Sequence, residues 1–231
     1  IKEFGAYLAE LNLPTRMLLG DNSDATTFDF ILPALNNSET HKYIGAVSFH
    51  SWRGCDDVTL RKWADAAKEI NVPLLVGEGS TDAAAHGYAE IFNESTFALY
   101  EINLYTRICT ICQPLSILQW QLTSDYSLLW GDGIYGSKGP LRPTQRFWNI
   151  KQLASTPADA LAIPVSSSKK NVNCAAFGNM VRGEYAVHMV NNGADCEAVI
   201  SGIPAEVKKL KVYVTNTKDC MKETAVKVEN G

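Results

Sequence analysis

The architecture is most visible in one short apolar run, Pro73-Leu74-Leu75-Val76-Gly77-Glu78. Its residues are nearly all apolar and do not alternate with polar ones, which is typical of a strand that is buried on both faces. Such strands occur in parallel sheets, where helices cover both sides. The run therefore predicts a parallel sheet, and it places the ionisable side chain of Glu78 at the carboxyl end of one strand.

Three similar runs, at residues 16–20, 44–50 and 115–121, accompany this one along the chain. A helical pattern follows each of the four runs, and strand and helix alternate at spacings of about thirty residues. Alternation of this kind predicts right-handed parallel units, either in a doubly wound sheet or in a barrel.

The expected helices are amphipathic. After residues 44–50, Asp56 or Asp57 can cap a helix that runs to about Asn71, and its apolar residues recur at helical spacing on one face. The remaining patterns predict helices at residues 1–11, 27–35, 83–112 and 144–154.

The pattern of apolar and polar residues changes from about Ala160 onwards. Alternating segments separated by glycine and asparagine turns are typical of antiparallel strands. We expect such strands at residues 172–177, 185–190, 210–214 and 225–228. A second, all-β domain is therefore predicted after the parallel one.

The composition excludes several classes of protein. Of the 231 residues, 46% are apolar and 20% are charged, which is typical of a globular chain. The formal net charge is −4 and there is no basic run, so we expect no nucleic-acid partner. No stretch approaches the roughly 18 apolar residues of a membrane span. The six cysteines are scattered; Cys109 and Cys112 lack a second pair or a nearby histidine, so we expect buried thiols and neither metal nor cofactor.

In parallel α/β folds the functional side chains gather at the carboxyl ends of the strands, because the following loops converge there. Glu78 is the strongest candidate for nucleophilic or acid/base chemistry, flanked by Gly77 and Gly79, which leave room for a ligand. His50 is a candidate for orienting that carboxylate. The alternatives are a helix cap or a rim ion pair for Glu78 and a structural role for His50.

Aromatic and polar residues in the same loops are candidates for binding a sugar. The flat rings of Trp52 and Trp120 suit the apolar face of a sugar ring, although aromatic side chains at such positions can also belong to a core. Asp21, Asn22 and Asp125 are candidates for accepting sugar hydroxyls, with turn and cap roles as the alternative.

These motifs resemble the clan A glycoside hydrolases, and within them family 30. The segment Val-Gly-Glu-Gly-Ser around Glu78 is similar to the seventh-strand nucleophile motif, Val-Ser-Phe-His-Ser-Trp with His50 to the sixth strand, and Leu-Gln-Trp-Gln with Trp120 to the eighth. Residues 139–149 resemble the last barrel helix. The resemblance implies an α/β fold with the C-terminal half of a (β/α)8 barrel (strands 5 to 8) at residues 1–157. An all-β sandwich, incomplete here, is implied at residues 158–231.

The resemblance also implies a retaining β-glycosidase with Glu78 as nucleophile. Such enzymes need a second carboxyl group about 5 Å away as acid/base, and the resemblance places it upstream of Ile1. We therefore expect a fragment, inactive alone, that pairs with the N-terminal half of its barrel or with a second copy. An extracytoplasmic location and a carbohydrate substrate are implied likewise. The alternative is a carbohydrate-binding protein without catalysis on a degenerate barrel.

Overall fold

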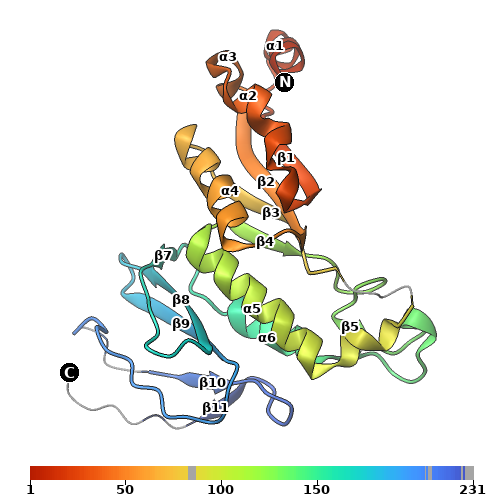
Figure 1. Ribbon diagram of the computed structural model, residues 1–231, viewed down its shortest axis with the longest axis vertical. Coiled ribbons are helices and arrows are strands. Elements are labelled where there is room, and N and C mark those ends of the chain that lie inside the picture. Colours follow the sequence, from red (N-terminus) through yellow and green to blue (C-terminus); the bar gives the residue numbers. More distant parts are fainter. Residues whose placement is uncertain (83–86, 206, 208–209, 225, 227–231) are drawn as a thin grey trace. The chain divides into compact units, whose positions relative to one another are not determined.

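The computed structural model of the protein describes residues 1–82, 87–205, 207, 210–224 and 226 (Figure 1). The chain forms two compact units. The first contains Ile1–Ala83 and Ile111–Trp120, and the second contains Ala84–Thr110 and Gln121–Gly231. The expected boundary between residues 157 and 158 remains a prediction.

The first unit contains a four-stranded parallel sheet. The strands lie side by side in the order in which they occur in the sequence: β1 (Met17–Asp24), β2 (Ile44–Arg53), β3 (Leu74–Gly79) and β4 (Ser116–Gln119). All four predicted strands are confirmed. Because a doubly wound sheet reverses its strand order at a switch point and a barrel does not, the order is consistent with part of a (β/α)8 barrel.

The helices of the first unit follow the sequence pattern only in part. As predicted, α4 (Asp57–Glu69) starts after Asp56, whose side chain accepts hydrogen bonds from the backbone N–H groups of Val58 and Thr59. The helix expected at residues 27–35 is instead a 3-10 helix, η1 (Ala25–Ile31), followed by the short α2 (Leu32–Leu35). Pro33 favours this break, since it lacks the N–H that would continue the earlier turns and suits the first turn of a new helix. The other helices are α1 (Lys2–Glu10) and α3 (Ser38–His41).

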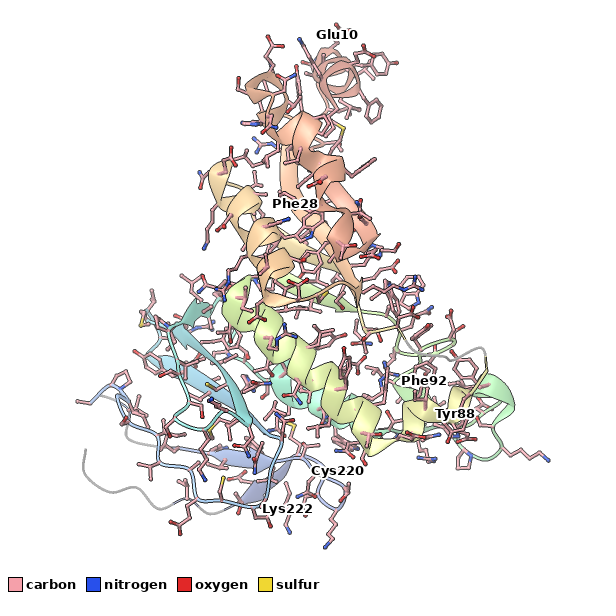
Figure 2. All side chains as sticks on the ribbon, in the orientation of Figure 1. Glu10, Phe28, Tyr88, Phe92, Cys220 and Lys222 are labelled. Atoms are coloured by element: carbon pink, nitrogen blue, oxygen red, sulfur yellow. The ribbon has the colours of Figure 1, made fainter. Side chains whose placement is uncertain are left out.

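The core of the first unit is centred on Trp63 of α4, whose side chain is completely buried. Its ring stacks on Phe49 of β2 at 5.4 Å between centroids and meets the edge of Phe28 at 5.2 Å. Phe28 is labelled in Figure 2. The indole N–H of Trp63 donates to the carbonyl oxygen of Ala25 at 2.8 Å, so the one polar group of this buried ring is satisfied. These contacts attach α4 and η1 to the sheet that carries the candidate site.

The second unit begins with helical segments that differ from the prediction. The prediction of a single helix at residues 83–112 is wrong. The 3-10 helix η2 (Ala89–Asn93) is followed by Glu94, whose backbone is extended, and the α-helix α5 (Ser95–Ile111) starts only after it. Residues 83–86 of that expected helix lie outside the described residues. The expected final helix is confirmed as α6 (Gln145–Leu153), with Thr144 as its N-cap. Between α5 and α6 lie the short elements β5 (Leu129–Trp130), η3 (Ile134–Gly136) and β6 (Arg142–Pro143).

A buried ion pair joins α5 to α6. The guanidinium of Arg146 donates from Nε and Nη2 to the two carboxylate oxygens of Glu101, at 2.9 and 2.7 Å. Nη1 of the same group donates to the carbonyl oxygens of Tyr126 and Ser127. The guanidinium also lies 5.0 Å from the ring centroid of Phe92 and 5.1 Å from that of Phe97. Both charged side chains are almost completely buried, which is tolerable only because their hydrogen bonds are so fully used.

The remainder of the second unit is antiparallel β-structure. β7 (Leu161–Ile163), β8 (Val172–Asn179) and β9 (Glu184–Asn191) form one sheet in that order, and β10 (Val212–Val214) pairs with β11 (Lys222–Thr224). The strands predicted at 172–177, 185–190 and 210–214 are confirmed, whereas most of the one predicted at 225–228 lies outside the described residues. The described strands form two separate sheets, and the β-sandwich remains a prediction.

Candidate functional site

The carboxyl ends of β1, β2 and β3 are irregular. The pairing of β1 with β2 shifts register between Gly20 and Asn22, and the pairing of β2 with β3 shifts between Phe49 and His50. After the second shift, His50 lies opposite Glu78. Bulges of this kind change the direction of side chains and are frequent beside active sites. Here they bring polar side chains of three neighbouring strands together.

Glu78 is held by side chains of β2. Its Oε2 atom accepts a hydrogen bond from the indole N–H of Trp52 at 2.9 Å and lies 3.2 Å from Nδ1 of His50. Its side chain is 28% exposed. In the described part of the chain, Oε1 has no hydrogen-bond partner and no lysine or arginine pairs with the carboxylate. One oxygen of the carboxylate is therefore held by β2, and the other has no hydrogen-bond donor among the described residues.

His50 lies between two carboxylates. Its Nε2 is 3.2 Å from Oδ1 of Asp21, and its Nδ1 faces Glu78 at the same distance. Neither ring nitrogen is aligned well enough for a hydrogen bond with a described residue, although the ring is buried. The Oδ1 atom of Asp21 also accepts a hydrogen bond from the hydroxyl of Ser48 at 2.8 Å.

The end of β2 is tied to the segment that follows β3. The hydroxyl of Ser51 donates to the carbonyl oxygen of Ser80 and accepts from the Ser80 N–H. The backbone N–H of Asp82 donates to the carbonyl oxygen of Trp52 at 3.0 Å, and Arg53 forms an ion pair with the Asp82 carboxylate at 2.5 Å. These bonds hold the Trp52 backbone in place, so the indole reaches Glu78 from a rigid support.

Trp120 follows β4 at the same end of the sheet. Its backbone N–H donates to the carbonyl oxygen of Gly79 at 2.7 Å, and Gly79 is the residue that follows Glu78 in β3. The residue is 37% exposed, so part of its ring surface is available to a ligand. A partly exposed indole suits the apolar face of a sugar ring.

The other predicted site residues are placed differently. The side-chain amide of Asn22 donates to the hydroxyl of Thr27 at 2.8 Å, an interaction that stabilises the local turn. Asp125 accepts a hydrogen bond from Gln121 at 2.7 Å and belongs to the second unit.

Two serines of the site did not emerge from the sequence analysis. Ser48 binds Asp21, and Ser51 binds the backbone of Ser80. A signal for Ser48 exists, because it precedes His50 by two residues and therefore lies on the same face of β2. Ser51 offers no comparable signal, since its partner is a backbone carbonyl.

Metal ligands do not converge in the part of the chain that the structure describes: no group of three or more histidine, cysteine, aspartate or glutamate side chains could hold an ion. Cys109 and Cys112 are both buried, and neither is part of a disulfide. The described helices include none that is long and apolar enough to cross a membrane.

The strand order, together with two solved structures, shows that this chain shares part of the fold of the clan A glycoside hydrolases. One is the catalytic domain of GH30 xylanase C from Talaromyces cellulolyticus, with a TM-score of 0.53 and 16% identity over 77% of this chain and 39% of that one. Another is SrfJ from Salmonella typhimurium, with a TM-score of 0.59 and 15% identity over 76% and 40%. A GH51 arabinofuranosidase from Xanthomonas axonopodis pv. citri has a TM-score of 0.48 and 13% identity over 85% and 49%.

The resemblance predicted from the short motifs is thus confirmed at the level of the fold. The chain spans about 40% of the length of the first two structures. Neither a family model nor a curated protein sequence matches the chain.

Proposed function

We propose that this chain is part of a retaining glycoside hydrolase in which Glu78 is the nucleophile. The observation that carries the proposal is the state of the carboxylate: Oε2 accepts a hydrogen bond from Trp52 and lies 3.2 Å from His50, while Oε1 has no hydrogen-bond partner among the described residues. A nucleophile needs one oxygen held in a defined direction and the other directed at the substrate.

In the proposed reaction, Oε1 of Glu78 attacks the anomeric carbon of a β-glycoside, and the bond to the leaving-group oxygen breaks. Water then hydrolyses the covalent glycosyl-enzyme. The acid/base carboxyl group is proposed to lie outside these 231 residues. The nearby alternatives are poor, because Asp82 is ion-paired with Arg53, and Asp21 is engaged by Ser48 and His50.

The decisive experiment uses substrates that need no acid. A 2-deoxy-2-fluoroglycosyl fluoride has a leaving group that departs without protonation, and its fluorine at the second carbon slows hydrolysis of the covalent intermediate. The β-xylosyl and β-glucosyl compounds are each incubated with the full chain. The intact mass shows whether a sugar has been added, and peptide mapping shows where. One of them should add a single sugar to the peptide that contains Glu78.

The matched control compares two glutamates. Glu78→Gln should abolish the labelling and leave folding intact, whereas Glu69→Gln, at an exposed position on α4, should be labelled like the wild-type chain. A label in Glu78→Gln, or a label on another carboxylate, contradicts the assignment.

The second candidate is a carbohydrate-binding protein without catalysis. It is favoured by one observation: retaining chemistry needs two carboxyl groups, and the other nearby carboxylates of the described site, Asp21 and Asp82, are engaged by Ser48 and Arg53. Binding of xylo- or gluco-oligosaccharides with no labelling by either fluoride would support this candidate. In both proposed functions, Trp120 supplies the surface on which a sugar ring stacks. The location proposed from the family resemblance is extracytoplasmic.

The proposed partner is the rest of the barrel. Among the described residues, β1 and β4 each pair with a strand on one side only, and each carries an exposed leucine, Leu18 at 48% and Leu118 at 55%. Open apolar edges of a parallel sheet are prone to pairing with further strands. We propose that the N-terminal half of the same barrel, or a second copy, covers them. Sedimentation of the chain at low concentration as a well-folded monomer would refute this.

A further inference from the structure

The carboxylate of Asp21 is directed by an unusual backbone conformation. Gly20 and Asp21 both have positive φ angles, +101° and +69°, at the point where β1 shifts register against β2. Positive φ is uncommon for a residue with a Cβ atom, and it is found at sites where the surrounding structure requires it. This bulge turns the Asp21 side chain over β2, where its Oδ1 meets the hydroxyl of Ser48 and the ring of His50.

Gly77 provides the space for this carboxylate. A Cβ atom at position 77 would lie 2.1 Å from Oδ1 of Asp21 and 2.8 Å from the hydroxyl oxygen of Ser48. Any side chain there would therefore displace Asp21. The glycine that precedes Glu78 thus accommodates a carboxylate of this chain, whereas the sequence had indicated room for a ligand.

The influence of Asp21 reaches Glu78 through His50. The two ring nitrogens of His50 face opposite carboxylates, Nε2 towards Asp21 and Nδ1 towards Glu78. Oδ1 of Asp21 lies against Nε2 at 3.2 Å, without the alignment of a hydrogen bond, and limits how far the ring can turn and with it the direction of Nδ1. The side chain of His50 is only 11% exposed, so the ring has little freedom to turn elsewhere.

We propose that Asp21 is a positioning residue, which sets the orientation of His50 and thereby of Glu78, and that it is not a ligand of the sugar. The inference rests on the proposed function of Glu78. Ser48 and Gly77 belong to the same arrangement, because one binds the Asp21 carboxylate and the other leaves room for it.

The first test separates positioning from binding. In the labelling of Glu78 by the glycosyl fluoride, Asp21→Ala should lower the rate constant at saturation by about tenfold to hundredfold, and the half-saturating concentration should change little. Asp21→Asn should recover part of the rate, since its amide oxygen still accepts from Ser48. Gly77→Ala should resemble Asp21→Ala. Asp65→Asn, an exposed carboxylate on α4, is the matched control and should behave as wild type.

The opposite pattern overturns the inference. If Asp21→Ala raises the half-saturating concentration and leaves the rate constant unchanged, Asp21 binds the sugar. Equal losses in the Asn and Ala variants also contradict the proposal, because the side-chain oxygen that Asp and Asn share, and that accepts from Ser48, would then not matter for the orientation of His50.

A second readout requires no reactivity. The chain has five tryptophans, so their indole N–H signals can be resolved by ¹H–¹⁵N NMR, and Trp52→Phe assigns the one that donates to Glu78. Asp21→Ala and Gly77→Ala should shift the Trp52 signal, while the signal of Trp63, which donates to Ala25, reports an intact fold. An unmoved Trp52 signal would overturn the inference. If the wild-type chain is not labelled at all, the nucleophile assignment fails, and this spectrum still decides whether Asp21 acts on Glu78.

Discussion

Trp52 and Glu78 are joined by a hydrogen bond of 2.9 Å from the indole nitrogen to Oε2, so a side chain of β2 determines which oxygen of the carboxylate remains free. The indole N–H of tryptophan can only donate, so Oε2 is the acceptor of this bond.

Trp52→Phe should slow the labelling of Glu78. It removes a hydrogen bond to a charged group, which is worth about 1.5 to 3 kcal/mol, while a flat apolar ring remains. We expect the rate constant to fall by roughly tenfold or more. Trp148→Phe, in the second unit, is the matched control. An unchanged rate in Trp52→Phe would show that the bond does not orient the nucleophile.

Removal of one partner from the Glu101–Arg146 pair should destabilise the second unit strongly. Glu101→Leu or Arg146→Met leaves a buried charge without its partner, and we expect a loss of about 3 to 5 kcal/mol in the free energy of unfolding. The double variant Glu101→Leu/Arg146→Met should lose less than the sum of the single variants. Urea unfolding measures all three, and a single variant that loses less than about 1 kcal/mol would contradict this role.

His188 should make the chain less stable in acid. Burial lowers its pKa from the ordinary 6.5 to about 4, so the folded chain keeps this ring neutral, hydrogen-bonded to Thr156, while the unfolded chain protonates it. The free energy of unfolding should therefore fall as the pH drops from 6.5 towards 4, by up to about 3 kcal/mol from this residue. The stability that His188→Gln loses relative to wild type should shrink over the same range.

Direct titration of His188 by NMR provides the check on this prediction. A midpoint near its ordinary value, rather than near 4, would remove the residue as a cause of acid sensitivity.

The cysteines should divide into reactive and protected groups. Burial raises the pKa of Cys109 to about 12, and Cys112 is also buried, whereas Cys196 and Cys220 are exposed. Because the thiolate is the reactive form, iodoacetamide should modify the two exposed cysteines of the native chain and reach Cys109 only in urea. Peptide mapping by mass spectrometry gives the order of modification. Alkylation of native Cys109 as fast as that of Cys196 would contradict the described burial.

Much of the first unit could be predicted because its signals are local. The apolar runs of β1 to β4, the cap at Asp56 and the apolar face of α4 are each contained in a few consecutive residues. The helix predicted at residues 83–112 was wrong because a continuous helical pattern did not reveal the extended backbone at Glu94. The Glu101–Arg146 pair gave no sequence signal, since its partners lie 45 residues apart.

The candidate site divides in the same way. The end of a buried strand indicated Glu78, His50 and Trp120, because all parallel strands present their carboxyl ends at one edge of the sheet. Sequence could not distinguish Asp21 from Asn22, which are adjacent and chemically similar. The bulge at Gly20 separates them: it turns Asp21 towards His50 and leaves Asn22 bonded to Thr27.

The sequence by itself determined the four parallel strands, the carboxylate at the end of β3 and the resemblance in fold to the clan A glycoside hydrolases. These features depend on apolar patterns and strand ends, which are formed by residues that are neighbours in the sequence. Only the tertiary structure decided that Gly77 makes room for the carboxylate of Asp21, and that Trp52 and His50 share one oxygen of Glu78. Such contacts depend on register shifts between strands. A shift of one residue changes the direction of a side chain, and no local pattern records it.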